Sequence, residues 1–198
     1  KIKWNMIPGR ALSLLVNGKF LANHNLKESY TNWILQQPTA KFTGYVFELA
    51  KRLRKLGVVG GMCYHHVEIP IEIKHTIDAQ FNQVVETALN GGKIKENVLC
   101  CLDTSGSMQQ QVNGLPNVMC CDIATSLALF FAKINKGAFH NVLMRFDSNS
   151  YPVTLESESF CENLTKLPSC PCGTTNFQSV IDEIVKIRKE KPEIPLEE

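Results

Sequence analysis

The stretch Val98-Leu-Cys-Cys-Leu-Asp-Thr-Ser-Gly-Ser107 decides the fold that this chain is expected to adopt. Its apolar run, residues 98–102, predicts a strand buried on both faces, as in parallel sheets that are covered by helices. Polar residues follow at once, and a helical pattern begins at about Val118. A strand, a polar turn and a helix in this order are typical of α/β proteins, in which ligands bind at the carboxyl ends of the strands.

Three oxygen-bearing side chains alternate in the polar part of this stretch. Asp103, Ser105 and Ser107 supply one carboxylate and two hydroxyls, which a turn at the end of a strand can aim at one point. Hard oxygen ligands with little total charge suit Mg²⁺ or Mn²⁺. The simpler interpretation is a strand that ends in a polar turn and a helix cap, because Asp, Ser and Gly are common there.

The pattern of strand and helix continues toward the C-terminal end. We expect a second strand at 141–146 and a short antiparallel edge strand at 151–155, with helices at 118–133, 159–167 and 176–190. Residues 96–198 therefore predict an α/β domain with a doubly wound, mainly parallel sheet. Such sheets usually have five or six strands, so we expect this region to be the N-terminal half of a larger domain whose other strands lie elsewhere.

Residues 1–95 are expected to form a mainly helical region. Apolar residues recur at helical spacing through residues 1–56, with a third helix at 39–56 that ends at Gly57. The part from 57 to 95 is mixed: a further helix is expected at 76–89, after a segment that Pro70 interrupts.

Composition excludes several classes of protein. The 198 residues are 44% hydrophobic with a net charge of +2, so nucleic-acid binding would require a local basic patch. No apolar run approaches the roughly 20 residues of a membrane span, and no signal peptide is expected. Most of the eight cysteines are expected to be reduced, because Cys100–Cys101 and Cys120–Cys121 are neighbours within predicted elements and make poor disulfide partners. A local bridge or metal site involving Cys161, Cys170 and Cys172 stays open.

A second polar segment, Gly173-Thr-Thr-Asn-Phe177, leads into the last predicted helix. One of its threonine hydroxyls can complete the metal site that Asp103 begins. Alternatively, the segment is an ordinary helix N-terminus in which a threonine or the asparagine caps the helix. Asp147 ends the second strand at the same rim, either as a residue that orients the metal ligands or as a simple turn residue.

These motifs together resemble the von Willebrand factor A domain. The matching segments are D-T-S-G-S-M at 103–108, R-F-D-S at 145–148 and G-T-T-N-F at 173–177. The resemblance implies a metal-ion-dependent adhesion site with Asp103, Ser105 and Ser107 as ligands, and with Thr175 as the loop threonine. The family's last aspartate, which follows a later strand, has no counterpart in these residues.

The N-terminal part extends the resemblance. The segment W-N-M-I-P-G-R-A at 4–11, followed by helices and an A domain, is similar to an uncharacterised group of intracellular proteins from plants, fungi, bacteria and large DNA viruses. That group is related to the Ro (TROVE) ribonucleoprotein family, in which a helical ring precedes an A domain. The resemblance implies a cytoplasmic protein, or a virion protein if the source is viral.

Three functions follow from these expectations. The first is a non-enzymatic module in which Mg²⁺ or Mn²⁺ binds a carboxylate of a partner protein, within a larger assembly and without a membrane. The second is RNA binding by Ro-like analogy, through the basic run Lys51, Arg52, Arg54 and Lys55, which is otherwise an ordinary solvated helix face. The third is a structural subunit with a vestigial metal site. No catalytic motif of the common hydrolase, phosphate-loop or zinc-protease types is present, so an enzyme is not expected.

Overall fold

In the computed structural model of this chain, residues 101–103 of the decisive stretch form one edge of a three-stranded sheet, whereas residues 98–100, expected in the strand, lie outside it, and Cys101 is exposed instead of buried. The structure describes residues 2–17, 19–57, 68–92, 96, 98–167 and 173–193. The strands are β1 (Cys101–Asp103), β2 (Val142–Phe146) and β3 (Ser150–Thr154), arranged side by side in that order. β1 pairs in parallel with β2, with Asp103 opposite Phe146, and β2 pairs antiparallel with β3. The mixed α/β class and the antiparallel edge strand are thus confirmed, while the described strands form one parallel and one antiparallel pair.

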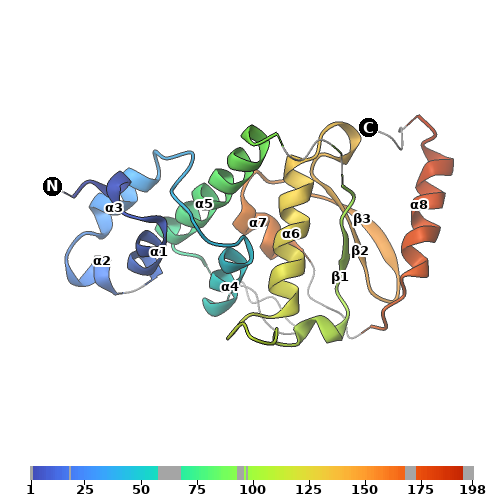
Figure 1. Cartoon of the computed structure of the whole chain (residues 1–198), viewed down its shortest axis with the longest axis horizontal. Helices are drawn as coiled ribbons and strands as arrows, with labels where there is room; N and C mark the ends of the chain where they lie inside the picture. The colour runs from blue at the N-terminus through green and yellow to red at the C-terminus, as the bar shows by residue number, and fades with distance from the viewer. Residues whose placement is uncertain are drawn as a thin grey trace.

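Helices cover the two faces of this sheet. α6 (Cys120–Ile134), which connects β1 to β2, contacts both strands from one side, and α8 (Gln178–Glu190) contacts β2 and β3 from the other (Figure 1). β2 buries apolar side chains on both faces of the sheet. Leu143 belongs to the main core, and Met144 belongs to a second cluster that includes Val180 of α8. This three-layer arrangement explains why residues 142–146 read as an uninterrupted buried strand.

The expected helices of the N-terminal region are present with changed bounds. The elements in order are η1 (Trp4–Met6), α1 (Gly9–Asn17), α2 (Phe20–Asn23), α3 (Lys27–Ile34), α4 (Phe47–Lys55) and α5 (Ile71–Asn90). α5 begins earlier than expected because Pro70 precedes its first residue, where a proline ring suits a helix start, instead of interrupting the segment. The remaining helical elements are η2 (Gly106–Gln109), η3 (Gly137–Phe139) and α7 (Phe160–Lys166).

α4 is shorter than its apolar pattern predicts. Residues 39–46, expected to be helical, run along α5 instead, where the Ala40 amide donates to the Ala79 carbonyl and the Gln80 side chain donates to the Lys41 carbonyl. Gly9 permits this path, because a Cβ atom there would lie 2.2 Å from the Lys41 carbonyl oxygen. Tertiary hydrogen bonds therefore outweigh local helical periodicity in this segment.

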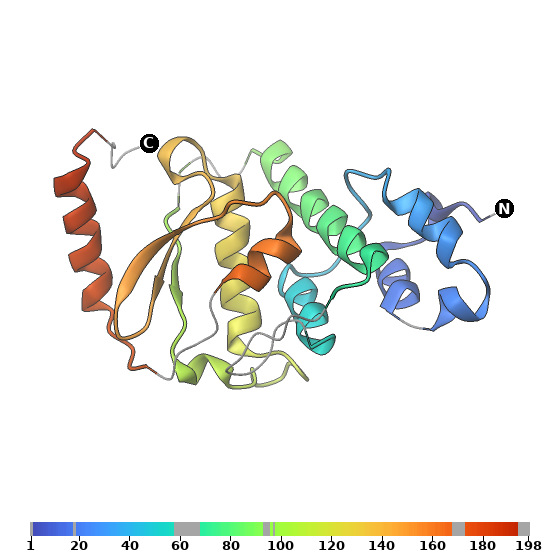
Figure 2. The same ribbon diagram turned by 180° about the vertical axis from the view of Figure 1, so that it is seen from behind.

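One continuous core joins the two halves of the sequence. α4 packs on α6 and α5 packs on α7, which Figure 2 shows from behind. The rings of Phe81 in α5 and Phe160 in α7 stack with centroids 4.4 Å apart, and the same cluster includes Leu53 and Leu129. Among the described helices, none has the length and apolar character that crossing a membrane requires.

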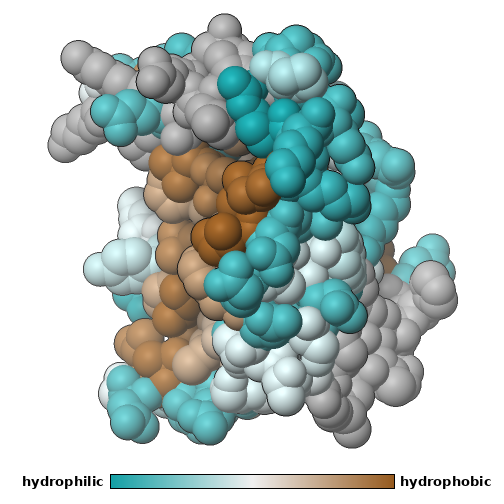
Figure 3. Space-filling view, turned by 90° about the vertical axis from the view of Figure 1, so that its right-hand side faces the viewer, coloured by the Kyte–Doolittle hydropathy of each residue, from teal (hydrophilic) through white to brown (hydrophobic). Residues whose placement is uncertain are grey.

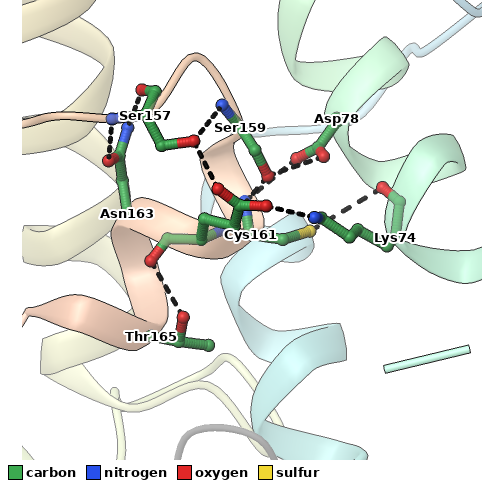
Figure 4. A network of polar contacts seen from close by, with 8 residues as sticks. Lys74, Asp78, Ser157, Ser159, Cys161, Asn163 and Thr165 are labelled. Atoms are coloured by element: carbon green, nitrogen blue, oxygen red, sulfur yellow. Dashed lines mark hydrogen bonds and ion pairs between the residues drawn. The ribbon is translucent and has the colours of Figure 1, made fainter. Parts of the chain in front are cut away.

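A polar network fixes α7 on α5 (Figure 4). The Asp78 carboxylate accepts hydrogen bonds from the Ser159 hydroxyl at 2.7 Å and from the Cys161 amide at 3.0 Å. Ser159 in turn accepts from the Glu162 amide and so caps α7, and Glu162 pairs with Lys74. The start of α7 thus has both a serine cap and a carboxylate beside its N-terminus, where helix dipoles favour negative charge.

Five cysteines of the described residues are free thiols, as expected: Cys100, Cys101, Cys120, Cys121 and Cys161. Burial raises the pKa of Cys161 well above its ordinary value, with the Asp78 carboxylate adding to the shift, and burial raises the pKa of Cys100 to about 11. Cys170 and Cys172 lie outside the described residues.

We expect these thiols to react very differently with an alkylating agent. Since the thiolate is the reactive form, native protein at pH 8 should be modified last at Cys161, roughly 100-fold or more slowly than an unfolded thiol. Mass spectrometry after timed iodoacetamide treatment, with urea-unfolded protein as the control, measures the rates. Early labelling of Cys161, or a Cys100–Cys101 or Cys120–Cys121 disulfide, would contradict the described packing.

Candidate metal site at the carboxyl ends of β1 and β2

The Asp103–Ser107 stretch forms a tight turn at the end of β1. Asp103 is the last residue of the strand, and its carboxylate accepts a hydrogen bond from the Ser105 amide at 2.8 Å. The hydroxyl oxygens of Ser105 and Ser107 lie 3.0 Å apart and share a hydrogen bond. Ser105 is buried and Ser107 is exposed, so this pair of hydroxyls lies at the protein surface. The turn therefore gathers the three predicted ligands locally.

The spacing of the two hydroxyls fits a small octahedral cation. Neighbouring ligands around Mg²⁺ at about 2.1 Å lie about 3.0 Å apart, and this is the observed separation of the Ser105 and Ser107 oxygens. The donor set is one carboxylate and two hydroxyls, which suits a hard divalent ion that retains water ligands. Among the described residues, no cluster of three or more His, Cys, Asp or Glu side chains offers an alternative metal site.

Asp147 links this turn to the end of β2. Its carboxylate accepts hydrogen bonds from the Ser148 amide at 2.6 Å and from the Asn149 amide at 3.3 Å, as a turn residue would. The same carboxylate accepts a hydrogen bond from the buried Thr104 hydroxyl at 3.4 Å. Thr104 is also held by the Phe146 carbonyl, to which its amide donates at 2.9 Å. Asp147 therefore acts in its own turn and also contacts the residue next to Asp103.

The third segment reaches the same rim. The Asn176 amide donates to the Asp147 carbonyl at 2.8 Å, and the Thr174 amide donates to the Ser148 hydroxyl at 3.1 Å. Gly173 eases this approach, because a Cβ atom there would lie 2.7 Å from the Ser148 hydroxyl oxygen and would force that side chain to shift. Thr175 lies between these anchored residues in an exposed position. The fold thus brings the 173–177 loop to the β2 end of the rim that carries the Asp103 turn.

Arg145 is the residue of this rim that the pattern of ligands did not single out. Its side chain is 3% exposed, donates from Nε to the Thr104 hydroxyl at 2.9 Å, and pairs with Asp147 at 3.4 Å. The guanidinium also lies over the ring of Tyr151, 5.3 Å from its centroid. The available signal was a charged residue within an otherwise apolar strand, since buried charges are normally paired. Arg145 and Asp147 together stiffen the link between the two strand ends.

The basic run of α4 is largely engaged within the chain. Arg54 forms a bidentate pair with Asp122, Lys51 donates to the Pro116 carbonyl at 2.7 Å, and Arg52 donates to the Gln80 side chain at 2.7 Å. Lys55 is exposed. The run is therefore not a uniformly solvated face. His65 and His66, the other adjacent ligand-type pair, lie outside the described residues.

Comparison with known proteins adds no relative to this picture. No family model matches the chain, and neither the curated proteins nor the solved structures include a significant match.

Proposed function

We propose that this chain is a divalent-cation-dependent protein-binding module, with Asp103, Ser105, Ser107 and Thr175 as the side chains that hold Mg²⁺ or Mn²⁺. The observation that carries the proposal is the pair of serine hydroxyls 3.0 Å apart beside the Asp103 turn. Hydrogen bonds from residues 174 and 176 to the Asp147–Ser148 corner support a contribution from the threonine loop. Asp103, Ser105, Ser107 and Thr175 are the ligands that the resemblance to A domains implies.

The charge balance of the site favours binding of an acidic partner. One carboxylate among neutral hydroxyls leaves much of the charge of a divalent ion uncompensated, so a carboxylate from a partner protein is an attractive further ligand. The cation supplies an electrophilic point that such a carboxylate can occupy. The Asp147 carboxylate is committed to amide and hydroxyl donors, which suits a role in positioning the turn better than a role as a base.

The apolar surface beside the sheet supports the doubly wound form of the fold. α8 and the residue before it expose Phe177, Ile181 and Val185, and Figure 3 shows hydrophobic side chains gathered in a band on this side of the molecule. β1 lies at the edge of the described sheet, with Cys101 exposed. We infer that further strands beside β1 cover this band in the complete A-type domain, because soluble proteins rarely leave large apolar patches open.

The contacts of α4 make RNA binding the weaker candidate. Three of the four basic side chains already donate hydrogen bonds within the chain, and one of them neutralises the carboxylate of Asp122. Phosphate binding that included Arg54 would break its ion pair with Asp122. The structural-subunit hypothesis predicts that the serine pair has no affinity for a cation.

Capture of a partner tests the proposal. The immobilised protein, incubated with an extract of its source cells, is expected to retain a protein in Mg²⁺ and to release it in EDTA. The Asp103→Asn variant should retain about 10-fold less, and Asp182→Asn, an exposed aspartate of α8, is the matched control. Raising salt from about 50 mM to about 200 mM should matter far less than chelation, since steep salt dependence marks phosphate contacts. Retained RNA that survives EDTA and is lost at high salt would contradict the proposal.

A further inference from the structure

Cationic side chains from two separate helices meet in a pocket remote from the metal site. The pocket has a volume of about 610 Å³ and lies between α1, α4 and the loop that carries Leu115 and Pro116. Its lining includes four cations and one carboxylate, Glu48. The cations are Arg10, Lys51, Arg52 and Lys55. Because Arg10 lies about forty positions from the others in the chain, the basic run alone does not predict this cluster.

These cations are not neutralised by ion pairs within the part of the chain that the structure describes. Within the described ranges, no carboxylate forms an ion pair with any of the four, whereas the neighbouring Arg54 is paired with Asp122. Glu48, the one carboxylate of the lining, accepts a hydrogen bond from the Tyr45 amide at the start of α4. The pocket therefore has a surplus of positive charge, which low-dielectric walls concentrate on an anion that enters it.

Arg52 is the half-buried arginine of the lining. It donates to the neutral Gln80 side chain at 2.7 Å, and its guanidinium lies 5.7 Å from the centroid of the Phe42 ring. Burial lowers the pKa of Arg52 to about 10, and the nearby Glu48 carboxylate only partly opposes the shift. A partly desolvated guanidinium that forms no ion pair within the described residues is a ready partner for a phosphate, which accepts two parallel hydrogen bonds from such a group.

Aromatic side chains stand beside the cations. Tyr45 and Phe47 both line the pocket, and their rings stack with an interplanar angle of 7° and centroids 5.5 Å apart. Tyr45 is 72% exposed, so this aromatic pair is accessible from solvent. Exposed aromatic rings beside arginine and lysine are suited to a ring that carries a phosphate, since the base stacks while the phosphate pairs.

We propose that this pocket binds a small phosphorylated ligand with an aromatic ring, of the size and chemistry of a nucleoside monophosphate. The volume lies within the range of small-molecule sites. The same phosphate-and-base unit occurs in RNA, but the pairing of Arg54 with Asp122 ends the row of available cations at this point. A free mononucleotide therefore fits the described surface better than an extended strand.

Calorimetry with adenosine monophosphate, inorganic phosphate and adenosine as separate probes tests the proposal. Each titration is carried out in EDTA, so that phosphate held by a cation at Asp103 does not contribute. The monophosphate is expected to bind at least about 10-fold more tightly than either fragment, because both halves of the pocket contribute. Equal affinities for the monophosphate and for inorganic phosphate would overturn the assignment of the aromatic half.

Variants at exposed positions separate the two halves of the pocket without threatening the core. Arg10→Gln with Lys55→Gln should weaken both the monophosphate and phosphate by about 10-fold, since both residues are exposed cations of the lining. Tyr45→Ala should weaken the monophosphate alone, by about 5-fold or more. The matched control is Lys186→Gln with Lys189→Gln, which removes the same charge from α8 at the opposite end of the molecule (Figure 1).

Two results would overturn the proposal. One is an equal loss of affinity in the α8 control and the pocket variant, which shows that the ligand senses only net charge. The other is an RNA oligonucleotide that binds far more tightly than the monophosphate, with a salt dependence that indicates several phosphate contacts. The second result would show that the pocket binds an RNA strand instead of a small phosphorylated ligand.

Discussion

Mn²⁺ binding is expected to be lost when Asp103 is replaced by asparagine. The amide retains an oxygen that accepts the Ser105 hydrogen bond at the turn, but it removes the one negative charge of the predicted ligand set. Removing a group that merely supports a ligand typically lowers affinity 10- to 100-fold, so loss of the charged ligand itself should exceed about 100-fold. Electron paramagnetic resonance of free Mn²⁺, together with calorimetry, measures the affinity.

The Mn²⁺ affinities of variants at the two serines, and of a control variant, are compared with that of Asp103→Asn. Ser105→Ala and Ser107→Ala remove neutral ligands and should weaken binding by about 10-fold each. Asp182→Asn, an equivalent change on exposed α8, should have no effect. Thermal unfolding distinguishes a lost site from a lost fold, and the Asn variant is expected to unfold close to the parent protein. Unchanged Mn²⁺ affinity in Asp103→Asn would show that the serine pair and Asp103 are only a polar turn.

The largest loss of stability is expected from Asp122→Ala. The Asp122 side chain is 3% exposed and receives Arg54 in a bidentate pair, with Nε at 3.0 Å from one oxygen and a terminal nitrogen at 2.9 Å from the other. It also accepts from the Met119 amide at 2.9 Å and so caps α6. Alanine leaves Arg54 in a half-buried position without its counter-charge and removes the cap. We expect a loss of about 3 kcal/mol, reduced from the fully buried value because Arg54 keeps some solvent.

Unfolding in urea measures this loss, which corresponds to a fall of about 8 °C in the melting temperature of a domain of this size. Glu156→Ala is the comparison, because Glu156 pairs with Lys166 on the surface at 3.7 Å and should contribute under about 0.5 kcal/mol. The double variant Arg54→Met with Asp122→Ala should recover part of the stability, since no unpaired charge remains. A loss below about 1 kcal/mol in Asp122→Ala, or no recovery in the double variant, would contradict this account of how α4 docks on α6.

Local patterns predicted β2 and α6 better than β1. The apolar run at 141–146 indicated β2 and the helical pattern after Val118 indicated α6, whereas the strand expected at 98–102 shares only residues 101 and 102 with β1. These elements follow from which residues a covered sheet and an amphipathic helix must bury, and that information is periodic in the sequence. Periodicity failed at 39–46, where a pattern suited to a helix yields to hydrogen bonds with α5.

The side chains proposed as ligands in the Asp103 turn could be recognised in the sequence because the turn is local. Asp103, Ser105 and Ser107 lie within five positions, so a strand end and a polar turn bring them together whatever surrounds them. The partners of charged groups were not visible in the same way. Nothing in the basic run of α4 indicates that Arg54 pairs with Asp122, 68 positions away, while Arg52 donates to the neutral amide of Gln80.

The sequence by itself determined the α/β class, the strand–turn–helix around Asp103 and the chemistry of the oxygen-bearing side chains proposed as ligands, because each depends on neighbouring residues. Only the tertiary structure decided that Asp147 and Thr104 connect the two strand ends, and that Arg10 joins the cations of α4 in one pocket. The physical reason is that the charge and hydrogen-bonding capacity of a side chain are set by its type, whereas its partner depends on how distant helices pack.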